Sequence, residues 1–162
     1  PLFRPLGHQY AQRNKANLEY KSGNARKTLV KSEDTHSGQY IFRGTQTKPE
    51  VVFEQGFKRY GTLDLQRHVD ANDKSGFIST TKDAKIAKHE YYVSSGDYVY
   101  TIKPQPHGVD VNNALGKAHL YSFEQEVAVP KSISPSDIMG ARQIGSDNKF
   151  VGPFIKNPNY RQ

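Results

Sequence analysis

Two glutamates, Glu124 and Glu126, are separated by a single residue and precede a run of small and β-branched residues. The segment Glu124–Val129 is predicted to be a strand, and alternate side chains of a strand point to the same face, so both carboxylates should face one space. Two neighbouring carboxylates repel each other, which is tolerated where a cation or a proton transfer compensates. The pair indicates acid–base and cation-stabilising chemistry, the simplest alternative being a solvated strand face.

Three consecutive hydroxyl side chains end the apolar segment Phe77–Thr81, which is predicted to be a buried strand. A hydroxyl such as that of Ser79 can donate a hydrogen bond to a carboxylate and fix its rotamer before a substrate arrives. The alternative role of these hydroxyls is to cap a helix predicted over Ala84–Tyr92, with Thr81 or Asp83 as the capping residue.

Arg43 follows the predicted strand Gln39–Phe42 and precedes Gly44. A planar guanidinium group can bind a phosphate through two parallel hydrogen bonds, and a neighbouring glycine allows close approach of the ligand. An arginine at an ordinary surface turn would have the same local sequence. By itself, therefore, Arg43 fits an anion site and an ordinary surface turn equally well.

The order of these motifs, arginine, then Ser-Thr-Thr, then Glu-x-Glu, resembles the cholera-toxin and pertussis-toxin branch of mono-ADP-ribosyltransferase toxins. The similarity runs from about Tyr40 to Ile144 and includes residues 49–57, which resemble the helix that follows the family's arginine, and residues 133–140. The resemblance implies an α+β fold in which two roughly perpendicular antiparallel β-sheets form an NAD cleft with flanking helices.

The resemblance also assigns roles around the bond that joins nicotinamide to ribose in NAD. Glu126 would bind the nicotinamide ribose and stabilise the positive charge that moves onto the sugar as nicotinamide leaves. Ser79 would hold Glu126 in place. Thr80 and Thr81 would support the wall of the site, Thr81 standing where the family usually has serine.

NAD binding is expected from two further segments. Arg43, together with Gly44 and Thr45, would bind a phosphate of NAD. His68 fits a Leu-x-x-His pattern that helps some family members to bind the nicotinamide ribose. The spacing of eleven positions between His68 and Ser79 is shorter than in the toxin relatives, so a histidine with a purely structural role is the alternative.

The acceptor of ADP-ribose is expected to meet Glu124 and the loop before it. In the family, glutamate at this position accompanies transfer to arginine, whereas glutamine accompanies transfer to asparagine, cysteine or guanine. The loop Leu115–Phe123 corresponds to the family's target-recognition segment. Its aromatic residues Tyr121 and Phe123 are expected either to anchor the target or to pack in the core.

The chain is predicted to consist of a basic, polar segment over residues 1–38 and a catalytic domain over residues 39–162. Residues 1–48 hold nine Lys and Arg against three Asp and Glu, which gives +6 of the net charge of +7. The composition of residues 1–38 is typical of a linker, and the sequence is compatible with a short helix from about Ala11 to Tyr20. Short helices and strands follow without regular alternation, including Leu63–Asp70, Tyr98–Ile102, Ile138–Ile144 and Phe150–Phe154, which favours an α+β domain.

The composition excludes several classes of site. The chain has no cysteine, so disulfides and cysteine-based zinc sites are excluded. The histidines are not spaced as in zinc sites, so no metal is expected. By the resemblance, NAD would be the substrate. No run approaches the ~20 apolar residues that a membrane span requires.

The expected function is mono-ADP-ribosylation of a target protein, at arginine, by a toxin or effector domain. By resemblance, a bacterium would secrete or inject it, with a delivery or parent polypeptide as a further partner, and it would act in the recipient-cell cytosol. ADP-ribosylation of nucleic acid or hydrolysis of NAD is the first alternative. A catalytically silent binding module of the same fold is the second.

Overall fold

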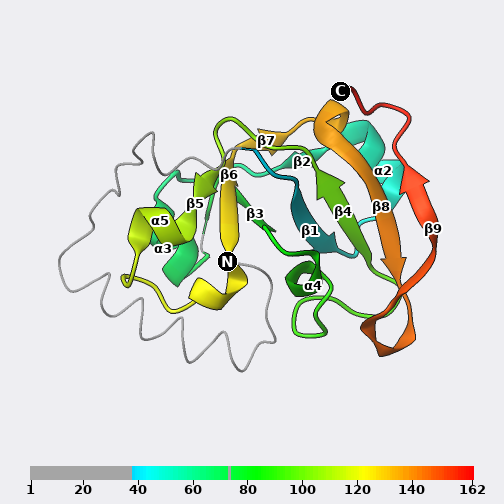
Figure 1. The fold of residues 1–162 in the computed structure, drawn as a ribbon. Helices are drawn as coiled ribbons and strands as arrows, with labels where there is room; N and C mark the ends of the chain where they lie inside the picture. The colour runs from blue at the N-terminus through cyan, green and yellow to red at the C-terminus, as the bar shows by residue number, and fades with distance from the viewer. Residues whose placement is uncertain (1–37, 73) are drawn as a thin grey trace.

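The computed structural model describes residues 38–72 and 74–162, so the predicted linker and the helix Ala11–Tyr20 lie outside the described residues. The described strands are β1 Ile41–Thr45, β2 Phe57–Lys58, β3 Phe77–Thr81, β4 Tyr98–Ile102, β5 Val109–Asp110, β6 Glu126–Pro130, β7 Ser132–Ile133, β8 Ile138–Ile144 and β9 Phe150–Lys156. The described α-helices are α2 Pro49–Gln55, α3 Leu65–Asp70, α4 Ala84–Ala87 and α5 Val111–Leu115. Figure 1 shows α3 and α5 at one end of the molecule and α2 at the other.

Seven strands form an antiparallel sheet in the order β5-β6-β3-β1-β4-β8-β9, and β2 pairs with β7 in a smaller second sheet. Strand β1 pairs with β4 along its whole length, from Ile41↔Ile102 to Thr45↔Tyr98, but with β3 only at Phe42↔Thr81. The two halves of the large sheet therefore meet at one point. This junction places the arginine-bearing strand directly beside the strand with the three hydroxyls.

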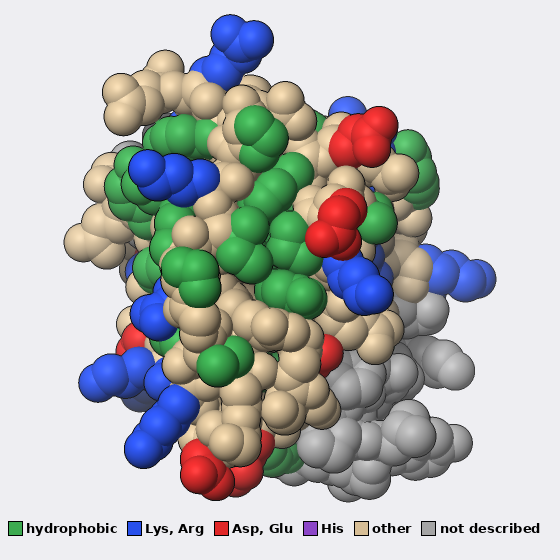
Figure 2. All heavy atoms as spheres, turned by 90° about the vertical axis from the view of Figure 1, so that its right-hand side faces the viewer, with side chains coloured by type: hydrophobic (Ala, Val, Ile, Leu, Met, Phe, Trp, Pro, Cys, Tyr) green, Lys and Arg blue, Asp and Glu red, His purple; other side chains and the backbone are tan. Residues whose placement is uncertain are grey.

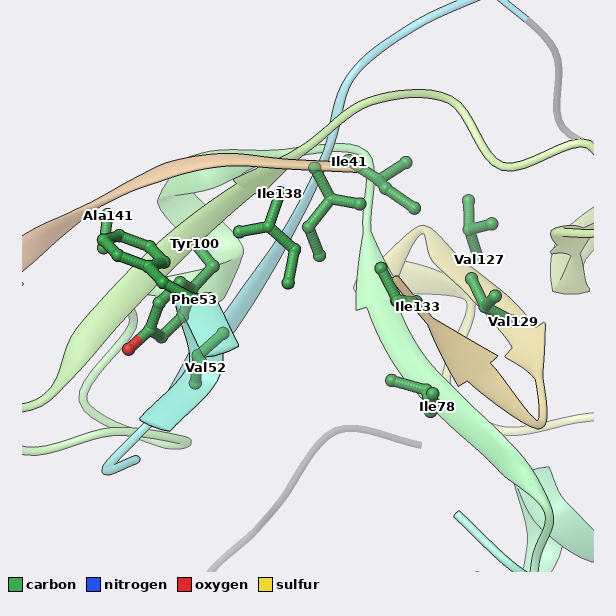
Figure 3. Packing of buried hydrophobic residues seen from close by; sticks show 11 residues of the cluster. Ile41, Val52, Phe53, Ile78, Tyr100, Val127, Val129, Ile133, Ile138 and Ala141 are labelled. Atoms are coloured by element: carbon green, nitrogen blue, oxygen red, sulfur yellow. The ribbon is translucent and has the colours of Figure 1, made fainter. Parts of the chain in front are cut away.

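The main core lies between α2 and the large sheet. Val52 and Phe53 of α2 pack near Tyr100 of β4, whose ring meets that of Phe53 edge to face at 6.1 Å (Figure 3). A second core packs α3 and α5 against the β5-β6-β3 half of the sheet through Leu65, Val69, Phe77, Val109, Val111, Leu115 and Tyr121. The main core also includes Ile78 of β3 and Val127 and Val129 of β6, so it extends across both halves of the large sheet.

The face formed by α2, β8 and β9 carries a gathering of hydrophobic side chains at its centre (Figure 2). Exposed apolar side chains on these elements are Val51, Val151 and Phe154. Strand β9 is an edge strand, and it contains Pro153, which cannot donate to a further strand. The proline limits extension of the sheet beyond this edge.

Several predicted elements are confirmed. Helix α2 begins at Pro49 and ends before Gly56, whose φ of 68° suits glycine, and β4 and β8 have their predicted bounds. The α+β class with antiparallel sheets is also confirmed, although the large sheet joins what was expected as two separate sheets.

Helix α4 is shorter than predicted, because it ends at Ala87 instead of continuing to Tyr92. Asp83, not Thr81, caps it by accepting a hydrogen bond from the backbone N–H of Lys85. Beyond the helix, the chain turns so that Val93 joins Ala87 and Val99 in a third core cluster. Burial of Val93 thus overrides the helical pattern of the sequence.

Candidate active site

The two glutamates do not lie on one strand, so the prediction that a strand begins at Glu124 is wrong. Glu124 ends a 3-10 helix, Ser122–Glu124, and Gln125 adopts a left-handed conformation with φ 46° and ψ 47°. Strand β6 begins only at Glu126, because a left-handed residue interrupts the alternation of an extended chain. Both glutamate side chains are nevertheless buried at the start of β6, with exposed fractions of 0% and 2%.

The carboxylate of Glu126 lies within a cluster of polar side chains from three elements. Its Oε2 is 2.7 Å from Nε2 of His68 on α3, and Ser79 on β3 forms a hydrogen bond with the same carboxylate. The Ser79 hydroxyl also lies 3.1 Å from Nε2 of His68. The structure therefore brings together the three residues that the sequence predicted for the nicotinamide-ribose site.

The charge state of this cluster follows from its burial and hydrogen bonds. Burial lowers the pKa of His68 to about 4, although Glu126 opposes this shift, so the imidazole is neutral near pH 7. Burial also disfavours ionisation of Glu126. His68 and Ser79 nevertheless contribute to holding its pKa below the ordinary value, so Glu126 carries a negative charge.

Arg43 lies in the middle of β1 and connects the two halves of the sheet. Its Nη1 donates to the carbonyl oxygen of Ser79 at 2.7 Å, and its guanidinium lies over the ring of Phe57, 5.3 Å from the centroid. Burial and the charge of Arg59 lower the pKa of Arg43 to about 10, and Glu126 acts in the opposite direction. Arg43 remains a cation near neutral pH.

A hollow of about 350 Å³ opens beside Arg43. The residues that line it include Arg43, Gly44, Thr45, Tyr92, Ser94 and Asp97. The Nε of Arg43 is buried and has no hydrogen-bond partner in the part of the chain that the structure describes. A guanidinium N–H with unused hydrogen-bonding capacity beside a hollow fits a phosphate group.

Gly44 is sterically required at its position. A Cβ atom there would lie 2.2 Å from the carbonyl oxygen of Ala87 and 2.8 Å from a methyl carbon of Val93. Helix α4 therefore packs directly on the backbone of β1, next to the arginine.

Thr80 and Thr81 support the site through backbone contacts. Thr80 donates from Oγ1 to the carbonyl oxygen of Val127 at 2.7 Å. Thr81 donates to the carbonyl oxygen of Glu124 at 2.7 Å and so holds the turn that carries this glutamate. Their expected position in the wall of the site agrees with these bonds.

The two aromatic residues of the predicted recognition loop differ in position. Tyr121 is buried in the second core, so it does not present its ring to a target. Phe123 is 57% exposed and lines an apolar hollow of about 370 Å³ with Ile86, Tyr91 and Tyr92. Of these two aromatic residues, therefore, only Phe123 has an exposed ring.

Sequence reasoning missed Ser75 and Arg59, which contact this site. Ser75 lies 2.6 Å from Nδ1 of His68, and Arg59 donates to the carbonyl oxygen of Phe77 at 3.2 Å. Ser75 is seven residues from His68, and this sequence separation does not predict a contact between their side chains. Both contacts depend on the tertiary fold.

Within residues 38–72 and 74–162, no group of three or more metal-ligating side chains could hold a metal ion. Over the same residues, no helix combines the length and apolar character that a membrane span requires.

The chain was compared with protein families and with proteins of known structure. Residues 41–160 match the family described as Scabin-like. A curated relative, the guanine-specific ADP-ribosyl transferase of Streptomyces coelicolor, is 30% identical over 127 residues, which cover 75% of this chain and 60% of the relative. The chain thus spans less than two thirds of that relative's length.

Two solved structures share this fold. The Scabin toxin from Streptomyces scabies in complex with NADH superposes with a TM-score of 0.70 at 30% identity, covering 82% of this chain and 86% of that one. A guanine-specific ADP-ribosyltransferase superposes with a TM-score of 0.69 at 28% identity, covering 87% and 93%. The chain belongs to the Scabin-like family, and its predicted relationship to bacterial mono-ADP-ribosyltransferase toxins is confirmed.

Proposed function

We propose that this chain is a mono-ADP-ribosyltransferase that cleaves NAD and transfers ADP-ribose to guanine in a nucleotide or nucleic acid. The observation that carries the proposal is the buried Glu126 carboxylate, held by His68 and Ser79 within reach of the charge of Arg43. The NADH complex of the Scabin relative supports a dinucleotide substrate, and two named relatives act on guanine.

The proposed reaction needs a negative charge beside the nicotinamide ribose. When the C–N bond to nicotinamide breaks, its electron pair leaves with the neutral base and the sugar becomes cationic. Glu126 would interact more strongly with this cation than with ground-state NAD, which is the condition for catalysis. A nitrogen of the acceptor then forms the new bond to the sugar carbon and releases a proton.

Arg43 would supply the phosphate contact. Arg43 is one of the residues that line the hollow with Gly44 and Thr45, and its Nε is buried with no hydrogen-bond partner among the described residues. Because Arg43 also bonds to the carbonyl oxygen of Ser79, a bound phosphate would be fixed relative to Glu126. The proposal therefore gives Arg43 the positioning of NAD.

Guanine has hydrogen-bond donors and an aromatic ring that match Glu124 and Phe123. Its ring N–H and its amino group form a pair of donors that one carboxylate, Glu124, can accept. Phe123 is exposed next to this glutamate and offers an apolar ring for a base to stack on, an interaction worth about 1–3 kcal/mol per base. Glu124 would also orient the acceptor and receive the proton that it releases.

Transfer to arginine is the second candidate. A guanidinium group presents a similar pair of N–H donors and adds a positive charge that a carboxylate attracts. Glu124 favours this acceptor, because the resemblance associates glutamate at this position with arginine. Delivery from a bacterium into a recipient cell stays a prediction for either acceptor.

The acceptor can be tested with labelled NAD offered with guanosine, a guanine-containing oligonucleotide, an oligonucleotide without guanine, or a soluble arginine analogue. Label on guanosine or the first oligonucleotide alone supports the proposal, and label on the arginine analogue alone supports the second candidate. Release of nicotinamide with no labelled acceptor indicates an NAD glycohydrolase, and no release indicates a silent module.

Two variants separate cleavage from transfer. Glu126→Ala should abolish nicotinamide release as well as transfer. Glu124→Ala removes the carboxylate altogether, so it should retain more hydrolysis than transfer. Equal loss of both reactions in Glu124→Ala would contradict its role at the acceptor.

A further inference from the structure

Ser75 lies directly behind the His68 ring, on the side away from Glu126. Its side chain is buried, and its Oγ is 2.6 Å from Nδ1 of His68. The same Oγ accepts a hydrogen bond of 3.0 Å from the backbone N–H of Phe77. Ser75, His68 and Glu126 therefore form a continuous row of hydrogen-bonded groups.

The direction of each bond follows from the contact between Nε2 of His68 and the anionic carboxylate of Glu126. A serine hydroxyl has one proton, and the Phe77 N–H already uses an acceptor position on Oγ. If Oγ donates to Nδ1, a neutral imidazole carries its proton on Nε2, which then donates to the anionic Oε2 of Glu126. The opposite tautomer would place a lone pair of Nε2 against a carboxylate oxygen only 2.7 Å away.

We propose that Ser75 is a positioning residue, which fixes His68 in the tautomer whose Nε2–H donates to Glu126. The effect on catalysis rests on the proposed transferase function, whereas the tautomer is a property of the free protein. Nothing in the motif pattern of the sequence points to Ser75, because its contact with His68 exists only in the folded chain.

This arrangement preserves the charge that the proposed reaction needs. A neutral imidazole orients Glu126 and leaves its negative charge intact, whereas an imidazolium would compensate it. The described charged groups that act on His68 are Glu126 of β6 and Arg59, which follows β2, and the cation Arg59 disfavours protonation of the ring. The low pKa of His68 agrees with a neutral donor.

The position of Ser75 is well fixed. Ser75 forms a parallel bridge with Thr62, and Gly76 next to it packs so closely on Gly61 that a Cβ would lie 2.8 Å from the Gly61 carbonyl oxygen. The ring of Phe77 also contacts that of His68, with centroids 5.4 Å apart. The hydroxyl therefore has little freedom to turn away from Nδ1.

Nitrogen-15 NMR of the imidazole rings of the full chain tests the tautomer without NAD or an acceptor. The His68 signals are identified by their loss in His68→Gln. At pH 7 we expect a neutral ring with the proton on Nε2. A proton on Nδ1, or a charged ring, overturns the proposal, whether or not the protein is an active transferase.

Two serine variants then test the consequence. Ser75→Ala should populate the other tautomer of His68 or its charged ring. Nicotinamide release should fall about tenfold, the scale typical of such supporting residues. The acidic limb of the pH–rate profile should shift to higher pH. Ser75→Thr retains the hydroxyl and should restore the tautomer and the profile. A purely structural role would lower stability in Ser75→Ala without moving either readout, and that result overturns the proposal.

Discussion

Oγ1 of Thr81 donates a 2.7 Å hydrogen bond to the carbonyl oxygen of Glu124, so the last residue of β3 holds the turn that precedes β6. This bond connects the hydroxyl-bearing strand to the backbone of Glu124. It also explains why Glu124 and Glu126 are both buried at the start of β6 although a left-handed residue separates them.

Replacing Thr81 by valine should therefore uncouple transfer from cleavage. Thr81→Val removes the hydroxyl with little change in shape and leaves a buried carbonyl oxygen unsatisfied, at a cost of about 1–3 kcal/mol in the free energy of unfolding. We expect transfer to an acceptor to fall about tenfold and NAD hydrolysis to fall less. Thr81→Ser, which keeps the hydroxyl, is the control, and equal loss of both activities in Thr81→Val would refute this role.

The stability of the protein should fall as the pH decreases from 6.5 to 4. Burial lowers the pKa of His68 from 6.5 to about 4 in the folded chain, so the unfolded chain binds the extra proton across this interval. The contribution is complete above pH 6.5 and is on the order of 3 kcal/mol at 1.36 kcal/mol per pKa unit. Urea denaturation at pH 7, 5.5 and 4.5 measures it.

The matched variant for this prediction is His68→Gln, which retains a donor but does not titrate. Its free energy of unfolding should depend less on pH over the same interval. Glu126 acts in the same direction, but below its ordinary pKa of 4.5, so its effect appears at lower pH. An unchanged slope in His68→Gln would show that His68 is not the titrating group.

Arg43→Lys should weaken NAD binding in a pH-dependent way. Lysine cannot form two parallel hydrogen bonds with a phosphate, and it loses the stacking on Phe57, so we expect the KM for NAD to rise about tenfold. The burial that lowers the pKa of Arg43 to about 10 would also lower that of a lysine, so binding should weaken further above pH 8. Calorimetric titration with NAD at pH 7 and 9 distinguishes this from a simple loss of folding, and pH-independent binding would contradict it.

Phe123→Ala should affect only the acceptor step. Because its ring is 57% exposed, we expect little change in stability and none in NAD hydrolysis, but a rise in the acceptor KM by about tenfold if a base stacks on the ring. Tyr60→Ala is a matched control, because Tyr60 is an exposed aromatic residue outside the recognition loop. The same rise in both variants would argue against a specific stacking site.

The order of the motifs was sufficient to predict the fold class and to name the residues that gather around Glu126. Arg43 and Ser79 lie in the middle of β1 and β3, and Glu126 begins β6; the apolar pattern marks all three segments as strands. The short spacing between His68 and Ser79 leaves a purely structural histidine as the alternative in the sequence, whereas in the folded chain the ring of His68 contacts Glu126 directly.

The incorrect predictions have a common physical cause: each concerns a local backbone conformation or a burial that is selected by tertiary contacts. Glutamine is not a residue type that favours a left-handed conformation. Gln125 adopts it in a turn that is held by the hydrogen bond from the Thr81 hydroxyl to the carbonyl oxygen of Glu124. The sequence pattern does not indicate helix α5, since a five-residue helix has little periodicity, although Asp110 caps it and Leu115 anchors it. Tyr121 was ambiguous because its sequence neighbours are exposed while its own ring fills the second core.

The close packing of Ala87 on Gly44 has a consequence for recognising further members of this family. Any side chain at position 44 would force helix α4 away from the strand that carries Arg43, so mutation there would disturb the arginine without touching it. Selection should therefore retain glycine immediately after the arginine in homologues that keep this helix. An arginine–glycine pair is thus a stricter diagnostic signature for such homologues than the arginine by itself.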